Sequence, residues 1–151
     1  MIEMINKTQE ELEKLRKNLI ELPGWKEEIK VIDDKINAFN DINYSELGFK
    51  SGGKTFTIED LLAREETKKN GLTAKVLQTE YKLREIEAII ISLDENEQRV
   101  IRERYLDNLK ESNGFRNIAK RLMFGKSSVQ RIHDKAILKI ANKREEYIEI
   151  A

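Results

Sequence analysis

The side chains best suited to binding chemistry are concentrated between Ser112 and Arg144. This segment holds nine basic residues against one acidic residue, Asp134, which is a net charge of +8. The first 93 residues carry 15 basic and 18 acidic side chains, a net charge of −3, and the whole chain is formally neutral. A basic segment inside a neutral protein indicates an acidic partner, and nucleic acid is the commonest such partner.

Residue types that serve catalysis or metal binding are scarce. The chain has no cysteine and a single histidine, His133, which excludes disulfides, thiolate clusters and ordinary zinc sites. No nucleophile and base, and no pair of carboxylates, stand out among the many charged residues. We therefore expect a non-enzymatic protein without a cofactor or metal. We expect His133 to be an exposed helix residue, and Trp25, Tyr81 and Tyr105 to pack within the protein.

One short motif has the spacing of a nucleotide site. The residues GFKSGGKT, from Gly48 to Thr55, match the pattern G-x-x-x-x-G-K-[ST]. A phosphate-binding loop requires a buried strand before it and a helix start directly after it. The preceding AFNDINYSEL lacks the pattern of a buried β-branched strand, and the following FTIEDLL delays the next helix. A flexible turn within an irregular loop near residues 43–57 is the interpretation that fits this context.

The chain as a whole has the composition of an all-α protein. Hydrophobic residues make up 39% and charged residues 37%, with one proline, which is typical of long solvent-exposed helices. Apolar residues at alternating spacings of three and four predict helices over residues 3–22 and 25–39. Pro23 and Gly24 separate them, so the second helix either folds back as a hairpin or continues the first with a kink.

A further helix should begin near Ile58, because Thr57 and Asp60 have the spacing of a capping box. It contains a heptad seam of about three repeats. The seam residues are Leu72, Val76, Thr79, Leu83, Ile86, Ile90 and Leu93. Their partner is either the N-terminal helices of the same chain, the equivalent helix of a second chain, or both. Residues 1–93 are thus expected to form a helical hairpin or coiled-coil arm, with homodimerisation through this seam or the N-terminal helices.

No segment has the character of a membrane span or a secretion signal. The longest apolar run, Ala88–Ile91, is too short to cross a bilayer, and the N-terminus is charged from its third residue. We therefore expect a cytoplasmic protein that has no membrane partner.

Residues 94–151 have the element order of a helix-turn-helix domain. Asp94 with Glu97 predicts a helix start, and that helix should end near Leu106. A short helix follows from Phe115 to Leu122, then a tight turn at MFG, then a helix that begins at Lys126. The last helix should pack through Val129, Ile132, Ala136, Ile137 and Ile140.

The exposed face of that last helix is rich in hydrogen-bond donors. Its expected members are Lys126, Ser127, Ser128, Gln130, Arg131, Asp134 and Lys135. Arg and Gln side chains can contact the edges of guanine and adenine, whereas Lys and Ser more often hold phosphates. The N-terminus of such a helix fits the major groove of DNA, which is about 12 Å wide. The pattern therefore predicts binding to double-stranded DNA.

These residues also carry a family resemblance. The run LDENEQRVIRERYLDN, then NIAKRL, then SSVQRIHDKAILKI resembles region 4 of bacterial sigma factors, which reads the −35 promoter element. The resemblance covers residues 93–140. It implies that Lys126, Ser127 and Arg131 face bases, that Arg116, Lys120 and Gln130 lie near phosphates, and that RNA polymerase is a second candidate partner.

The long helical segment ahead of one such domain is similar to the ArpU- and RinA-like regulators of phage late operons. Gly125 and the serines at 127 and 128 depart from the sigma pattern, so the −35 sequence does not transfer to this chain. The expected function is a sequence-specific DNA-binding transcription regulator of phage or prophage type. The alternative is a non-enzymatic helical scaffold or adaptor, such as a phage packaging subunit or an RNA polymerase-binding protein.

Overall fold

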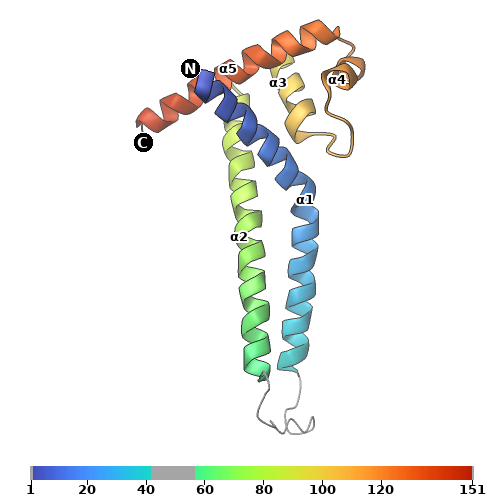
Figure 1. Cartoon of the computed structure of the whole chain (residues 1–151), viewed down its shortest axis with the longest axis vertical. Coiled ribbons are helices and arrows are strands. Elements are labelled where there is room, and N and C mark those ends of the chain that lie inside the picture. Colours follow the sequence, from blue (N-terminus) through green and yellow to red (C-terminus); the bar gives the residue numbers. More distant parts are fainter. Residues whose placement is uncertain (1, 42–56, 151) are drawn as a thin grey trace. The chain divides into compact units, whose positions relative to one another are not determined.

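In a computed structural model, the protein is all-α, as the sequence predicts (Figure 1). The structure describes the backbone of residues 2–41 and 57–150 and the side chains of residues 2–41 and 57–145. No β-strand occurs within these residues. The elements are α1 (Ile2–Asn40), α2 (Ile58–Ile90), α3 (Glu95–Ile101), the π-helix η1 (Arg102–Leu106), α4 (Phe115–Leu122) and α5 (Lys126–Ile150).

The two helices predicted before residue 40 form the single helix α1, with Pro23 inside it. The chain therefore continues through Pro23 and does not fold back there. Proline removes one backbone hydrogen bond, but its fixed φ is compatible with a helix that tertiary packing supports. The predicted apolar period is confirmed, because Leu12, Leu15 and Leu19 are buried, and Thr8, which continues the same spacing toward the N-terminus, is fully buried.

The chain divides into two compact units, and each is described by itself. One unit comprises Leu22–Gln78, and the other combines Met1–Glu21 with Thr79–Ala151. In the first, the later part of α1 packs beside the first part of α2 as a helical hairpin. Lys69 Nζ lies 2.6 Å from Asp33 Oδ1, and Lys75 Nζ lies 5.5 Å from the centre of the Trp25 ring. Most of the predicted irregular loop, including the motif from Gly48 to Thr55, lies outside the described residues.

Helix α2 begins where its capping box predicts. The Asp60 amide donates to Thr57 Oγ1 and the Thr57 amide donates to Asp60 Oδ2, both at 3.1 Å. The heptad seam is buried at Val76, Thr79, Ile86 and other positions within the single chain. Intrachain packing therefore covers much of the surface that was expected to serve a second copy, and homodimerisation stays a prediction.

The other unit gathers α3, η1, α4 and α5 around a small core. Val100, Ile118, Ala119 and Val129 are its buried members. Phe115, Leu122, Phe124 and Ile132 pack against it with part of their surface exposed. Residues 1–21 and 79–93 of this unit come from the predicted arm, so the compact units divide the chain at positions other than 93/94.

The helix predicted from Asp94 to Leu106 is present, and its last turn is a π-helix. The Asp94 amide donates to Glu97 Oε1 at 3.1 Å, as the capping box predicts. From Arg102 onward each backbone hydrogen bond joins residues five apart in the sequence instead of four. The Asp107 amide, for example, donates to the Arg102 carbonyl at 2.6 Å. No helix among the described residues is both long enough and apolar enough to span a bilayer.

Candidate nucleic-acid interface

Helices α4 and α5 are joined by the three-residue turn that the sequence predicts, residues 123–125. Met123 takes a left-handed backbone conformation with φ 61°, which ends α4. The Phe124 amide donates to the Ala119 carbonyl at 2.9 Å, and the Val129 amide donates to the Gly125 carbonyl at 3.0 Å. These bonds close one helix and open the next within a few residues.

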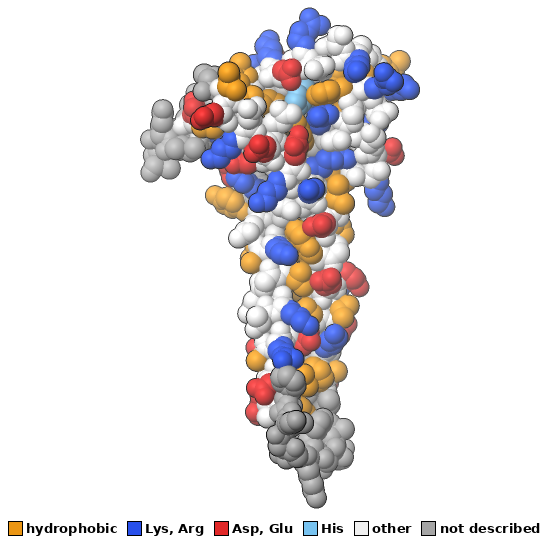
Figure 2. All heavy atoms as spheres, viewed as in Figure 1, with side chains coloured by type: hydrophobic (Ala, Val, Ile, Leu, Met, Phe, Trp, Pro, Cys, Tyr) orange, Lys and Arg blue, Asp and Glu red, His pale blue; other side chains and the backbone are white. Residues whose placement is uncertain are grey.

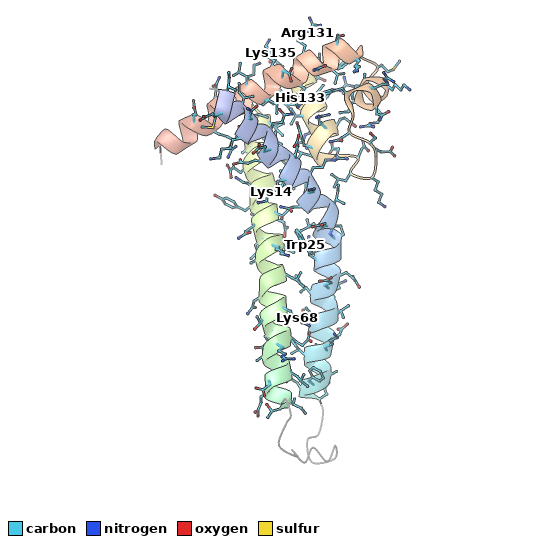
Figure 3. The ribbon with its side chains drawn as sticks, in the orientation of Figure 1. Lys14, Trp25, Lys68, Arg131, His133 and Lys135 are labelled. Carbon is cyan, nitrogen blue, oxygen red and sulfur yellow. The ribbon has the colours of Figure 1, made fainter. Side chains whose placement is uncertain are left out.

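Helix α5 turns one face to the core and the other to solvent. Val129, Ala136, Ile137 and Ile140 are buried and Ile132 is half-buried, as predicted. On the outer face Lys126, Ser127, Gln130, Arg131 and Lys135 are exposed, and Figure 3 labels Arg131 and Lys135 there. The prediction was wrong for Ser128, which is half-buried because its position on the helix lies next to the inward face.

The nine basic residues of the segment from Ser112 to Arg144 fall into two groups, and the first is held internally. Arg121 Nε lies 2.9 Å from Glu103 Oε2, and Lys139 Nζ lies 2.7 Å from Glu97 Oε1. Arg144 pairs with Glu11, and Lys143 also takes part in an interaction. These four cations are therefore partly or wholly occupied with intramolecular contacts.

The second group is open to solvent. Its members, Arg116, Lys120, Lys126, Arg131 and Lys135, are all exposed and form no ion pair with any described acidic residue. They are the same five cations that the sequence assigned to DNA contact. Figure 2 shows Lys and Arg side chains along the outer edge of this unit, over α5 and α4, with few Asp or Glu side chains between them.

His133 is buried, which corrects the expectation that it is exposed. It is 1 % exposed, and Nε2 lies 2.7 Å from the hydroxyl oxygen of Tyr105. The Phe115 ring meets it edge-on, with ring centres 5.0 Å apart. Its spacing of four residues from both Val129 and Ile137 was the signal that places it on the inward face. Burial lowers the pKa of His133, and the bond to Asp134 opposes that effect.

The aromatic side chains behave in three ways. Tyr105 is fully buried, as expected, and Trp25 is half-buried under Lys75. Tyr81 is 69 % exposed, so the expectation that it packs within the protein was wrong. Tyr81 lies on α2 between the seam positions Thr79 and Leu83.

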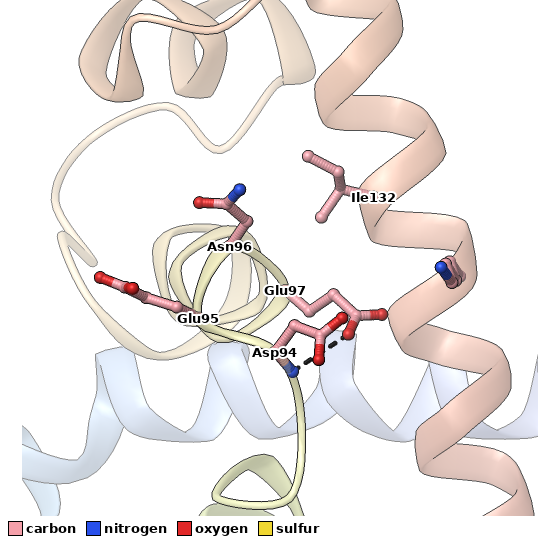
Figure 4. A pocket seen from close by; sticks show the side chains of 6 residues that line it. Asp94, Glu95, Asn96, Glu97 and Ile132 are labelled. Carbon is pink, nitrogen blue, oxygen red and sulfur yellow. Dashed lines mark hydrogen bonds between the residues drawn. The ribbon is translucent and has the colours of Figure 1, made fainter.

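A pocket of about 390 Å³ lies between the first turn of α3 and the middle of α5 (Figure 4). Asp94, Glu95, Asn96, Glu97, Ile132 and Lys135 line it. Three carboxylates against one ammonium group favour a cation over a phosphate. Apart from Lys135, the exposed cations of α4 and α5 lie outside this pocket.

Comparison of this chain with protein-family models, with curated proteins and with solved structures gives no match.

Proposed function

We propose that this protein is a non-enzymatic, sequence-specific regulator of transcription that binds double-stranded DNA through α4 and α5. The observation that carries the proposal is the division of the basic residues described above. Arg121, Lys139 and Arg144 pair with acidic residues, whereas Arg116, Lys120, Lys126, Arg131 and Lys135 are exposed around one helix-turn-helix. Free cations on the two helices of this motif are what a DNA interface requires.

In this proposal the first turns of α5 enter the major groove. Lys126, Ser127 and Arg131 then face base edges, and an arginine can make two parallel hydrogen bonds to guanine. Val129 and Ile132 hold this part of α5 on the core, so the reading side chains come from a supported helix. The free backbone N–H groups at the start of α5 add a positive end to the same surface.

Helix α4 supplies the phosphate contacts in the same arrangement. Arg116 and Lys120 are four residues apart and therefore lie on one face of α4. Gln130 and Lys135 extend the polar surface along α5, and the half-buried Ser128 lies at its border. Phosphate contacts fix the register of the protein on the duplex and base contacts select the sequence.

The test is selection from a pool of random duplex DNA, followed by sequencing. We expect the wild-type protein to enrich a short motif. Lys126→Ala combined with Arg131→Ala should abolish this enrichment, since it removes two of the proposed base-reading groups. The matched control is Lys26→Ala with Lys30→Ala, which removes the same charge from exposed positions of α1. Enrichment by the double α5 variant equal to that of the wild type would reject the assignment of α5 as reader.

A second candidate function is a helical adaptor that binds another protein. Tyr81 and Ile91 favour it, because they expose 69 % and 73 % of their surface on or directly after α2. RNA polymerase is the candidate partner in this case, and the basic face of α5 would then meet protein. A random DNA pool that stays unenriched by the wild-type protein would favour the adaptor over the regulator.

In this proposal the protein acts in the cytoplasm as a homodimer. Two copies of α5 related by a two-fold axis would read half-sites about 34 Å apart along the duplex. Light scattering measures the mass of the protein alone and with selected DNA. A palindromic motif from the selection, together with twice the monomer mass, is the expected result.

A further inference from the structure

Arg16, which the sequence pattern does not single out, is buried against the segment that leads into α4. The residue belongs to α1, only 9 % of it is exposed, and its guanidinium makes three hydrogen bonds. Nη1 donates to the Arg104 carbonyl at 3.1 Å, and Nη2 donates to the carbonyls of Glu111 at 2.9 Å and Leu109 at 3.4 Å. All three acceptors are main-chain oxygens, so these hydrogen bonds do not depend on the side chains of Arg104, Leu109 and Glu111.

The same segment, residues 107–114, is held by two more arginines, and we call it the connector. Arg104 of η1 donates from Nη1 to the Asn113 carbonyl at 2.7 Å. Arg121 of α4 donates from Nη1 to the Ser112 carbonyl at 3.0 Å. The Asn113 amide group donates back to the Arg104 carbonyl at 3.0 Å. Guanidinium groups from α1, η1 and α4 therefore hold successive carbonyls of the connector.

This arrangement brings three positive charges together, which opposes folding. Burial lowers the pKa of Arg16, and the charges of Arg121 and Arg104 lower it further. Glu103 compensates one of them through its ion pair with Arg121. An apolar residue at position 16 would remove this repulsion, but it could not bond the connector carbonyls. The fork of an arginine can reach separate carbonyls at once, which a lysine cannot do.

The connector is the only link along the chain between η1 and α4. Gly114 is the N-cap of α4, and the Ile118 amide donates to its carbonyl at 3.0 Å. A shift of the connector therefore moves the first turn of α4 and, with it, Arg116. Helix α5 packs on the core around Val129, to which α4 contributes Ile118 and Ala119 after its first turn.

We propose that Arg16 is a positioning residue for DNA binding, which holds the connector so that Arg116 and Lys120 meet phosphates while α5 lies in the groove. This inference rests on the proposed function. It makes the N-terminal end of α1 part of the DNA-binding unit, and it assigns Arg16 an effect on affinity without a contact to DNA.

The test compares Arg16→Met and Arg16→Lys with Lys17→Met, an exposed neighbour that loses the same charge. Hydrogen exchange of the connector amides, thermal unfolding, and affinity for the selected DNA at several salt concentrations are measured well below the melting temperature. We expect Arg16→Met to speed connector exchange and to weaken DNA binding by about ten-fold, a typical loss for one interface contact. The slope of log affinity against log salt should fall, because Arg116 and Lys120 are displaced from the phosphates.

Arg16→Lys should recover part of the affinity and part of the protection, and Lys17→Met should match the wild type in both. If Arg16→Met does not fold, Arg16→Lys carries the test with the same expected signs. Faster connector exchange with unchanged affinity would show that Arg16 is only structural and would overturn the inference. Weaker binding with an unchanged salt slope would also overturn it, since the phosphate contacts of Arg116 and Lys120 would then be intact. A wild-type protein that selects no DNA would instead reject the proposed function itself.

Discussion

The hydroxyl oxygen of Tyr105 lies 2.7 Å from Nε2 of His133, and the two side chains are 0 % and 1 % exposed. Nδ1 of His133 lies 3.0 Å from Asp134 Oδ1. A neutral ring with its proton on Nδ1 donates to Asp134 and accepts from the Tyr105 hydroxyl, so both nitrogens are satisfied. This pair joins η1 to α5 inside the unit that carries the candidate interface.

Stability should therefore depend on pH through His133. Burial is the largest cause of its lowered pKa, and Arg104 lowers it further, while Asp134 and Glu13 oppose the shift. The folded-state pKa lies below the unfolded value near 6.5, so the unfolded chain binds the proton more readily. The stability that neutral His133 contributes should be fully present above about pH 6.5. The free energy of unfolding should then fall as the pH drops through the folded-state pKa, by at most about 1.4 kcal/mol per pH unit.

Urea unfolding between about pH 7.5 and 5 measures this dependence, because His133 is the only histidine. The control is His133→Gln, which keeps a polar side chain but does not titrate. Its free energy of unfolding should vary less over the same range. Equal pH dependence in the variant and the wild type would contradict the assignment to His133.

Removal of the Tyr105 hydroxyl should destabilise the protein. Tyr105→Phe leaves the buried Nε2 of His133 without its donor, which typically costs about 1–3 kcal/mol. Tyr81→Phe is the matched control, because the same atom is removed from a side chain that is 69 % exposed. The control should change the free energy of unfolding by less than about 0.5 kcal/mol. Similar losses of unfolding free energy in the two variants would show that the hydrogen bond between Tyr105 and His133 does not stabilise the protein.

Replacement by alanine should affect DNA binding at Arg116 and stability at Arg121, although both residues belong to α4. Arg116→Ala should leave the melting temperature unchanged, weaken binding to all DNA sequences, and reduce the salt slope by about 0.9. Arg121→Ala should lower the melting temperature, because it leaves the half-buried Glu103 without its ion pair and frees the Ser112 carbonyl. Thermal unfolding and salt-dependent binding assays separate the two outcomes. Loss of stability in Arg116→Ala would place that residue inside the fold and outside the proposed interface.

Glycine in place of Met123, the residue of left-handed conformation that ends α4, should stabilise the protein. Met123 has φ 61° and is 91 % exposed, so its side chain adds backbone strain without burial. Met123→Gly should raise the free energy of unfolding by about 1 kcal/mol, since glycine adopts this conformation without a Cβ clash. Met123→Ala keeps the Cβ and should give no such gain. Equal stability of the glycine and alanine variants would argue against strain at this turn.

The start and end of most helices could be predicted because their signals are local. Thr57 with Asp60 and Asp94 with Glu97 bond within four residues, so the spacing alone locates the start of α2 and α3. The apolar period also identifies the inward face of α5 through Val129 and Ile140. The outward face follows from the same period, which is why Lys126 and Arg131 are exposed as expected.

The continuity of α1 through Pro23 was not decided by local signals. Proline permits either a break or a continued helix, and the choice depends on what the two halves pack against. The same is true of the heptad seam on α2, which could face its own chain or another. Its buried residues are covered within one chain in the structure.

The sequence by itself determined most of the helices, the short turn between α4 and α5 and the basic bias of its last third, because charge counts and short-range periodicity need no tertiary contacts. Only the tertiary structure decided which cations are free. Arg121 meets Glu103 across 18 residues, and Arg16 meets carbonyls about 90 residues away. The helical period places His133 on the inward face of α5, but its partner Tyr105 lies 28 residues earlier. Such pairings depend on how helices pack, and no spacing along the chain encodes them.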